Sequence, residues 1–453
     1  MNGKELVRNA ILCQEVERIP WVPFVGCHAA KLLDVSAEDY FKDAAQIVRG
    51  ALLADKLYEP DGLPVLFDLQ VEAEALGCRV QFSAENPPAV MAHPLEGTTD
   101  RSALRVPSKD DGRFPVVLEA ARRIVAELGD RMAIYGLVTG PFTLGLHLRG
   151  TDIFFDMLDD PDSVTELMAF CAEVCKTVAG WYLEAGVDIV AIVDPMTSQI
   201  SSDNFAEFVR PAATAVFDHI RDLGGLASFF VCGNAKRNIE EMCRCHPHNL
   251  SIDENIPLGY VKDIAERYGV SVGGNIQLTV TMLLGTPADN IRDAANCCAI
   301  GGKRGFVLSP GCDMPFATPA VNVQAIAAYV HGRDGEFLAT HQAEGLQVVA
   351  YDKPDYATKI GVDVDVITLD SESCAPCQYM MEAVRAAAKD LPALTVTEHK
   401  VKTPEGIGCM LALGVKNIPT IVVDGETRYI SIIPEVAELR ATFEQALRGK
   451  GLL

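Results

Sequence analysis

Apolar runs of strand length alternate with amphipathic stretches of helix length along the first 330 residues. The strand-like runs lie at 20–25, 63–67, 132–138, 187–193, 226–231, 250–252, 270–272 and 305–308. The helical stretches between them include 44–56, 116–128, 163–185, 204–223 and 288–300. Eight strands joined by helical crossovers predict an α/β fold, specifically a (β/α)8 TIM barrel.

The pattern changes after residue 329, where a polar connector leads into a shorter α/β unit. That unit has expected strands at 363–369, 395–399 and 418–423 and expected helices at 378–389, 404–413 and 435–447. We therefore expect a barrel domain at 1–330, a linker at 331–344 and a small C-terminal domain at 345–453.

Composition narrows the class of protein. The chain has 453 residues and a formal net charge of -23, and such a surface repels nucleic acid. Every long uncharged stretch is broken by Gly, Pro or polar residues, so no membrane helix is expected. Charges run through the first residues without an apolar stretch between them, so no secretion signal is expected. Together with 14 cysteines, these features predict an enzyme of the reducing cytoplasm.

Polar residues follow the predicted strands directly, and barrel enzymes build their active sites at these carboxyl ends. Asp68 and Asp194 are expected to carry protons or anchor a substrate, with helix capping as the alternative for each. We also expect His28, Asn234 and Asn275 to contact the substrate, because they lie at the same strand ends.

Two cysteines, Cys232 and Cys312, occupy the ends of the fifth and eighth predicted strands. A barrel would bring both to one rim, where two thiolates suit a zinc ion. A thiol bound to zinc loses its proton and becomes a nucleophile at neutral pH. The alternative is a pair of ordinary buried thiols.

A second cysteine-rich string, Cys243-Arg-Cys-His-Pro-His248, looks like a metal cluster. It follows the helix after the fifth strand and precedes the sixth strand. This order puts it on the amino-terminal face of the barrel, away from the expected site, so we interpret it as structural.

The C-terminal unit carries Cys374-Ala-Pro-Cys377 between a strand and a helix. A helix N-terminus favours the thiolate of the first cysteine, so the pair is predicted to be redox-active. Together with Gly414-Val-Lys-Asn-Ile-Pro-Thr420, the unit resembles thioredoxin over about 345–453. The resemblance implies a cis-proline at Pro419 beside the cysteine pair, where we expect it to contact the substrate. Cys409 is a further thiol, either a core residue or a partner in exchange.

An ordered series of short motifs runs through the barrel region: Arg18-Ile-Pro, Phe67-Asp-Leu-Gln-Val-Glu-Ala-Glu-Ala-Leu-Gly-Cys78, Gly140-Pro-Phe-Thr-Leu, Asp194-Pro195, Cys232-Gly-Asn, Ser251-Ile-Asp-Glu254, Gly274-Asn-Ile, Gly285-Thr-Pro and Leu308-Ser-Pro-Gly-Cys-Asp-Met-Pro315. Together they resemble the uroporphyrinogen decarboxylase superfamily over about residues 3–330. More narrowly, they are similar to its methylcobamide:coenzyme M methyltransferase branch and related corrinoid-dependent methyltransferases.

In that branch a His-x-Cys-Gly motif and a downstream Cys hold zinc, which activates a thiol to accept a methyl group. The resemblance maps these cysteines onto Cys232 and Cys312, but it maps the histidine onto Phe230, which cannot bind metal. We expect zinc to be retained with Glu254 as the substitute ligand; the substitutes weighed beside it are Cys27, His28 and Asp194. Two alternatives remain: the zinc is held only by the two thiolates and a substrate, or the site has lost zinc.

The resemblance implies corrinoid-dependent methyl transfer between a separate corrinoid protein and a thiol or another small methyl donor or acceptor. The alternative is a thiol–disulfide redox protein whose barrel binds a corrinoid, a tetrapyrrole or a partner. Uroporphyrinogen decarboxylation ranks lower, because residues 21–30 contain none of the arginines that clamp porphyrinogen carboxylates.

Overall fold

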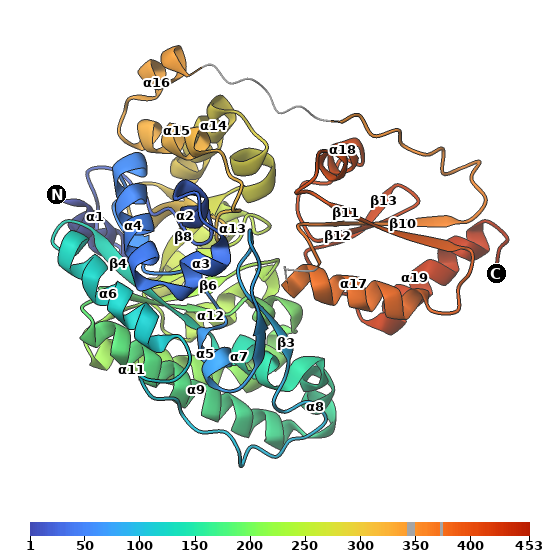
Figure 1. The fold of residues 1–453 in the computed structure, drawn as a ribbon, viewed down its shortest axis with the longest axis horizontal. Coiled ribbons are helices and arrows are strands. Elements are labelled where there is room, and N and C mark those ends of the chain that lie inside the picture. The colour runs from blue at the N-terminus through green and yellow to red at the C-terminus, as the bar shows by residue number, and fades with distance from the viewer. Residues whose placement is uncertain (342–348, 372–374) are drawn as a thin grey trace. The chain divides into compact units, whose positions relative to one another are not determined.

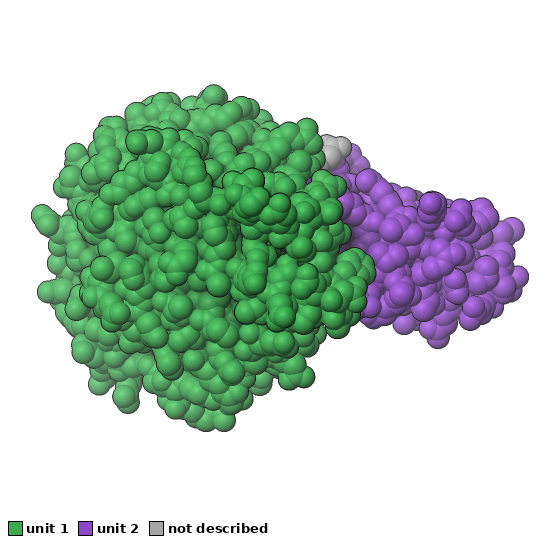
Figure 2. Space-filling view, turned by 90° about the horizontal axis from the view of Figure 1, so that it is seen from below, with its two compact units in different colours: residues 1–343 green, residues 344–453 purple. Residues whose placement is uncertain are grey.

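The computed structural model of the protein describes residues 1–341, 349–371 and 375–453. The chain forms two compact units, Met1–Ala343 and Glu344–Leu453, shown in different colours in Figure 2. Each unit has its own sheet and its own hydrophobic core.

A parallel sheet of seven strands, in the order β1-β4-β5-β6-β7-β8-β9, forms the centre of the first unit (Figure 1). The strands are β1 (Gly62–Pro64), β4 (Ala133–Thr139), β5 (Ile189–Val193), β6 (Leu226–Val231), β7 (Asn249–Ile252), β8 (Ser271–Ile276) and β9 (Phe306–Pro310). All of these strands are buried along their whole length, which explains why they read as continuous apolar runs.

The expected first strand, 20–25, is extended chain rather than a regular strand. Val22 N donates to Leu308 O at 2.9 Å, and Leu308 N donates to Pro20 O at 2.9 Å. On the other side, Asp61 N donates to Trp21 O at 2.8 Å. The segment therefore closes the ring of strands, between β9 and the residue before β1, and the predicted barrel is confirmed.

The helices that join the strands lie around the sheet (Figure 1). Between the strands are α4 (Ala44–Tyr58), α6 (Phe114–Leu128), α9 (Pro161–Glu184), α11 (Arg210–Asp222), α12 (Ile239–Arg244), α13 (Leu258–Tyr268) and α14 (Pro287–Gly301), and α15 (Ala320–Val330) follows β9. The start of α9 is set by its local sequence. Asp160 accepts a hydrogen bond from Ser163 N, and Pro161 occupies the first turn. No helix in the described part of the chain is long and apolar enough to cross a membrane.

Several short elements were not expected from the sequence. The hairpin β2 (Arg79–Gln81) and β3 (Ala89–Ala92) and the helices α7 (Pro141–Arg149) and α8 (Ile153–Asp159) extend the loops after β1 and β4. His93 Nδ1 lies 2.8 Å from His147 O, which ties the end of the hairpin to α7. The expected linker also contains a helix, α16 (Asp334–Thr340), while its residues 342–344 lie outside the described residues.

The second unit has a four-stranded sheet in the order β11-β10-β12-β13. Its elements are β10 (Val362–Thr368), α17 (Ala375–Ala388), β11 (Leu394–Lys400), α18 (Pro404–Ala412), β12 (Thr420–Val423), β13 (Glu426–Ile430) and α19 (Val436–Gly449). Strands β10 and β11 are parallel, whereas β12 and β13 form an antiparallel hairpin. The hairpin's second strand, β13, was not expected, because its side chains are largely exposed.

Candidate active site at the mouth of the barrel

Two cysteines meet at the carboxyl ends of the strands. Cys232 follows β6 and Cys312 follows β9, and the structure joins them in a disulfide with their Cα atoms 5.9 Å apart. Both side chains are partly exposed and pack against the barrel core. The fold thus brings together two thiols that lie 80 residues apart in the sequence.

The loop after β7 holds both cysteine turns in place. Asp253 Oδ2 accepts from Gly233 N at 2.8 Å, next to Cys232. Glu254 lies against Gly311, next to Cys312, and a Cβ added at Gly311 would overlap with Glu254 Oε2. The pair Asp253 and Glu254 therefore fixes the position of each cysteine relative to the other.

Glu254 has one carboxylate oxygen without a partner. Its Oε1 accepts from Leu278 N at 3.3 Å, whereas Oε2 is buried and has no hydrogen bond among the described residues. Burial, together with the charge of Asp253, raises the pKa of Glu254 well above its usual value. A protonated carboxyl beside the cysteine turns avoids leaving an uncompensated charge there.

Three aromatic rings belong to the core cluster against which Cys232 and Cys312 pack. Phe230 in β6, where the histidine was mapped, is 1% exposed. Its ring centroid lies 4.9 Å from that of Phe24 and 5.5 Å from that of Phe67. This position is filled by a core residue and contributes no metal ligand.

The expected zinc site is not shown by the structure. Within the described ranges, no group of three or more His, Cys, Asp or Glu side chains is arranged to hold a metal ion. The mouth offers two sulfur atoms, which are joined to each other, and the one unpartnered oxygen of Glu254.

Asp68, an expected catalytic residue, is held in a buried ion pair. Its Oδ2 lies 2.5 Å from Arg113 Nη1, and its Oδ1 accepts from Gln70 N at 2.8 Å. Arg113 also pairs with Glu74. These contacts fix the loop after β1 and give both carboxylate oxygens of Asp68 a partner within the protein.

Asp194, the other expected catalytic carboxylate, caps a helix. It accepts from Phe142 N at 3.1 Å and from Thr143 N at 2.7 Å, in the first turn of α7. These contacts match the alternative expectation, a helix cap. The capped helix, however, follows β4, whereas Asp194 itself follows β5. Burial raises the pKa of Asp194 to about 6.

The three barrel residues expected to bind substrate differ in their surroundings. His28 is fully buried, with Nε2 2.7 Å from Tyr58 Oη and Nδ1 3.2 Å from Phe316 O, so neither nitrogen is open to a substrate. Asn275 is also buried and donates to the carbonyls of Asp253 and Ile256, which positions the loop that carries Glu254. Of the three, Asn234 alone is partly exposed next to Cys232.

Two carboxylates near the mouth were missed by the sequence reasoning. Asp313 accepts from Gly26 N at 2.8 Å and joins the loop after residue 25 to the Cys312 turn. Burial raises its pKa well above its usual value. The signal was its position directly after Cys312.

Glu72, the second missed carboxylate, is completely enclosed at the start of α5 (Val71–Ala75). Its Oε1 accepts from Thr139 N at 3.3 Å, and its Oε2 lies 2.8 Å from Thr139 Oγ1. That hydroxyl has a single proton, and Leu69 O lies 2.8 Å away as its acceptor. A protonated Glu72 satisfies all three groups, and burial raises its pKa to about 7.

In the second unit, the expected cis-proline is confirmed: the peptide bond between Ile418 and Pro419 is cis. Cys377 is buried in the first turn of α17, while Cys374 lies outside the described residues. Cys409 is buried on α18, and burial raises its pKa to about 12, which describes a core thiol.

The comparisons with known proteins agree with this architecture. The family model described as uroporphyrinogen decarboxylase (URO-D) matches residues 2–333, and a model described as a thioredoxin domain matches residues 362–444. Methylcobamide:CoM methyltransferase MtbA of Methanosarcina acetivorans is 26% identical over 327 residues, covering 71% of this chain and 95% of that protein. Uroporphyrinogen decarboxylase of Anaeromyxobacter dehalogenans is 26% identical over 282 residues, covering 59% and 79%.

Among solved structures, a methyltransferase from Methanosarcina mazei has the same barrel fold. Its TM-score is 0.67 at 23% sequence identity, and the match covers 74% of this chain and 99% of that one. With a family model that spans nearly all of the first unit, the protein belongs to the uroporphyrinogen decarboxylase family, and a thioredoxin domain follows in the same chain.

Proposed function

We propose that the barrel transfers a methyl group between a corrinoid protein and a small thiol, at the mouth that carries Cys232 and Cys312. The main support is the position of this pair against the cluster of aromatic rings, in a chain similar to methylcobamide:CoM methyltransferases. The corrinoid is expected on a separate partner. The rings of Phe24, Phe67 and Phe230 would keep water from beneath the reacting sulfur.

Zinc is part of this proposal in the reduced protein. Reduction of the disulfide by a dithiol, which is itself oxidised to a disulfide, would supply two thiols that lose their protons on binding zinc. Glu254, whose Oε2 has no partner among the described residues, would be the third ligand. Zinc bound there would lower the pKa of a substrate thiol. Asp253 and Gly311 would keep these ligands in place through their contacts with the two cysteine turns.

The test of methyl transfer follows the loss of methyl from methylcobalamin when a small thiol is added to reduced protein. We expect Cys232→Ser and Cys312→Ser each to lower the rate by at least about 100-fold, because losing even an outer-shell partner of a metal site costs about 10–100-fold. The matched control is Cys298→Ser, which changes a partly exposed thiol near the C-terminus of α14. Equal rates in all of these proteins would contradict the proposal.

Metal content tests the zinc step separately. Anaerobically purified protein is expected to contain zinc in a one-to-one ratio, and Cys232→Ala and Cys312→Ala should each lower it. Cys374→Ala should leave the zinc content unchanged. The isolated chain should also show no corrinoid absorbance, because the corrinoid belongs to the partner. Equal zinc in the three variants would place the metal elsewhere.

The second candidate function is thiol–disulfide exchange. It is favoured by the disulfide between Cys232 and Cys312, by Phe230 in place of a metal ligand, and by the thioredoxin domain in the same chain. In such exchange, an attacking thiolate would form a mixed disulfide with one barrel sulfur and release the other as a thiolate. Trapping with Cys377→Ser tests it: a mixed disulfide through Cys374 would support redox function, and an unreactive Cys374 would contradict it.

A further inference from the structure

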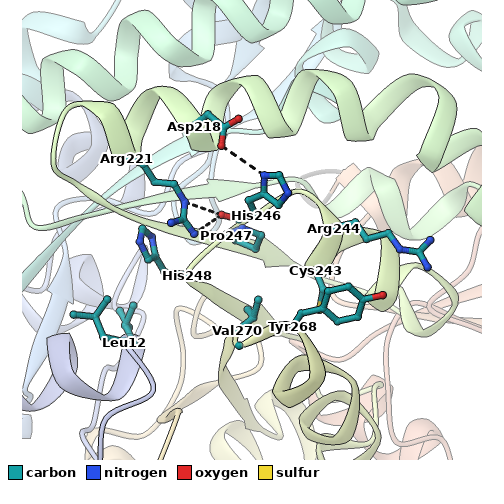
Figure 3. Close-up of a pocket in the computed structure, with 12 residues that line it drawn as sticks. Leu12, Asp218, Arg221, Cys243, Arg244, His246, Pro247, His248, Tyr268 and Val270 are labelled. Carbon is teal, nitrogen blue, oxygen red and sulfur yellow. Dashed lines mark hydrogen bonds and ion pairs between the residues drawn. The ribbon is translucent and has the colours of Figure 1, made fainter.

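A cavity lies at the opposite end of the barrel from the cysteine pair, where β7 and β8 begin. Figure 3 shows the residues that line it. We call it the floor cavity; its volume is about 590 Å³. The residues that line it come from the ends of α1 (Gly3–Ile11), α11, α12 (Ile239–Arg244) and α13 and from the loops that follow them. The string Cys243–His248, interpreted above as structural, forms one of its walls.

The chemistry of this string does not suit a metal. Cys245 is buried, with Sγ 3.3 Å from Glu241 O, and burial raises the pKa of Cys243 to about 12. His248 Nδ1 already accepts from Ala227 N at 2.9 Å. These contacts leave no set of deprotonated ligands facing one point.

What the cavity does offer is hydrogen-bond donors. Arg221 donates through Nε and Nη2 to His246 O, at 2.9 and 2.7 Å, which fixes the guanidinium and leaves Nη1 without a partner among the described residues. His248 is neutral, because burial and the charge of Arg221 lower its pKa to about 4. Since Nδ1 accepts a hydrogen bond, the ring proton is on Nε2, which has no partner in the described part of the chain.

The other charged groups around the cavity have partners. Asp218 Oδ1 lies 3.7 Å from His246 Nδ1, so this carboxylate faces an imidazole (Figure 3). Arg244 is paired with Glu240 and Glu241. Arg221, in contrast, has no carboxylate within ion-pair distance among the described residues, which makes it the cation available to a ligand.

Apolar groups complete the walls. Leu12 and Val270 line the cavity with the buried ring of Pro247. The volume is within the range of about 300–1,000 Å³ that is usual for small-molecule sites. One fixed cation, one neutral N–H donor and an apolar wall form a complementary surface for an anion that carries a hydrophobic body.

We propose that the floor cavity binds a small organic anion, with a phosphate or carboxylate group on Arg221 and His248 and an apolar body against Leu12 and Val270. Such a site is separate from the mouth, and it stands whether or not the barrel transfers methyl groups. A ligand there is an effector or a structural cofactor, because the chemistry of barrel enzymes takes place at the other end of the strands.

The probe for the test is phenyl phosphate, with inorganic phosphate and phenol as its two separate halves. Calorimetry on the full-length protein should show saturable binding of phenyl phosphate and weaker binding of either half. Arg221→Met should weaken binding by at least about 10-fold, the loss expected for a charge-assisted hydrogen bond. The matched control is Arg244→Met, which removes a lining cation that is already paired and should change the affinity by less than about 2-fold.

Two further variants keep the result independent of any change in loop structure. His248→Asn retains an acceptor for Ala227 N but removes the Nε2 donor, and it should weaken binding about 5-fold. Leu12→Trp fills the cavity without changing either donor and should abolish binding. The proposal is overturned if phenyl phosphate does not saturate, if Arg244→Met weakens binding as much as Arg221→Met, or if Leu12→Trp binds like the parent protein.

Discussion

The two ends of the barrel use arginine and histidine in opposite ways. On the mouth side, Arg113 is buried between Asp68 and Glu74, and both ring nitrogens of His28 have partners. At the floor cavity, Arg221 pairs with no carboxylate among the described residues, and His248 keeps one N–H open. Polar groups on the mouth side therefore hold the loops in fixed positions, whereas those of the floor are available to a ligand.

The largest expected effect compares the two arginines. Arg113→Met would leave Asp68 buried without its counter-charge, which is expected to lower the free energy of unfolding by about 3–5 kcal/mol. Arg221→Met removes hydrogen bonds to an exposed carbonyl and should cost about 1 kcal/mol. Urea denaturation measures both variants. Equal losses would show that the two ends do not differ in this way.

The next effect concerns Glu72, whose pKa is about 7 in the folded protein and near 4.5 when unfolded. A carboxyl with a raised folded pKa binds more protons in the native state. Its contribution to stability is therefore present below pH 4.5 and is lost as the pH rises to 7. Glu72→Gln can accept from Thr139 N and donate to Thr139 Oγ1, so it imitates the protonated form.

The variant Glu72→Gln should therefore match the parent protein near pH 4.5 and exceed its stability at pH 7.5. The difference should reach roughly 3 kcal/mol, at about 1.4 kcal/mol per pKa unit. Denaturation curves across this pH range provide the measurement, with Glu119→Gln on the exposed face of α6 as the control. A Gln variant that is less stable at every pH would show that Glu72 is charged in the folded state.

The barrel and the cysteine pair were predictable because they depend on features that the sequence carries directly. Fully buried strands are continuous apolar runs, and the carboxyl ends of parallel strands meet at one rim. This reasoning correctly brought Cys232 and Cys312 together. The thioredoxin-like unit was predictable for another reason, since its cysteine pair and its cis-proline occur in short local motifs.

The roles of individual polar residues were harder to predict, because they depend on partners far away in the sequence. Asp68 meets Arg113, which lies 45 residues later, and His28 meets Phe316, which lies 288 residues later. Strand periodicity contains no information about such contacts. The same reason explains why Glu72 and Asp313 were missed and why the floor cavity was not expected.

Gly311 provides a smaller effect at the mouth. A Cβ there would overlap with Glu254 Oε2 and lie 2.7 Å from Glu254 N, so Gly311→Ala must displace the loop after β7. We expect a loss of about 1–3 kcal/mol, as for other overpacked sites. Gly335→Ala is the control, because nothing lies within 4 Å of that position on helix α16, and it should be neutral or slightly stabilising. The same melting temperature for both variants would contradict the tight packing of the mouth.

The smallest effect compares the two histidines. Because Phe316 O can only accept, His28 carries its proton on Nδ1, and its Nε2 accepts from the Tyr58 hydroxyl at 2.7 Å. Tyr58→Phe removes that donor from a fully buried pair and should cost about 1 kcal/mol, with a matching decrease in melting temperature. His248→Asn keeps the acceptor for Ala227 N and removes only a donor that faces the floor cavity, so its stability should stay within about 0.5 kcal/mol of the parent. If His248→Asn were the more destabilising of the two, the floor histidine would have a structural role like that of His28, and the contrast between the two ends would be lost.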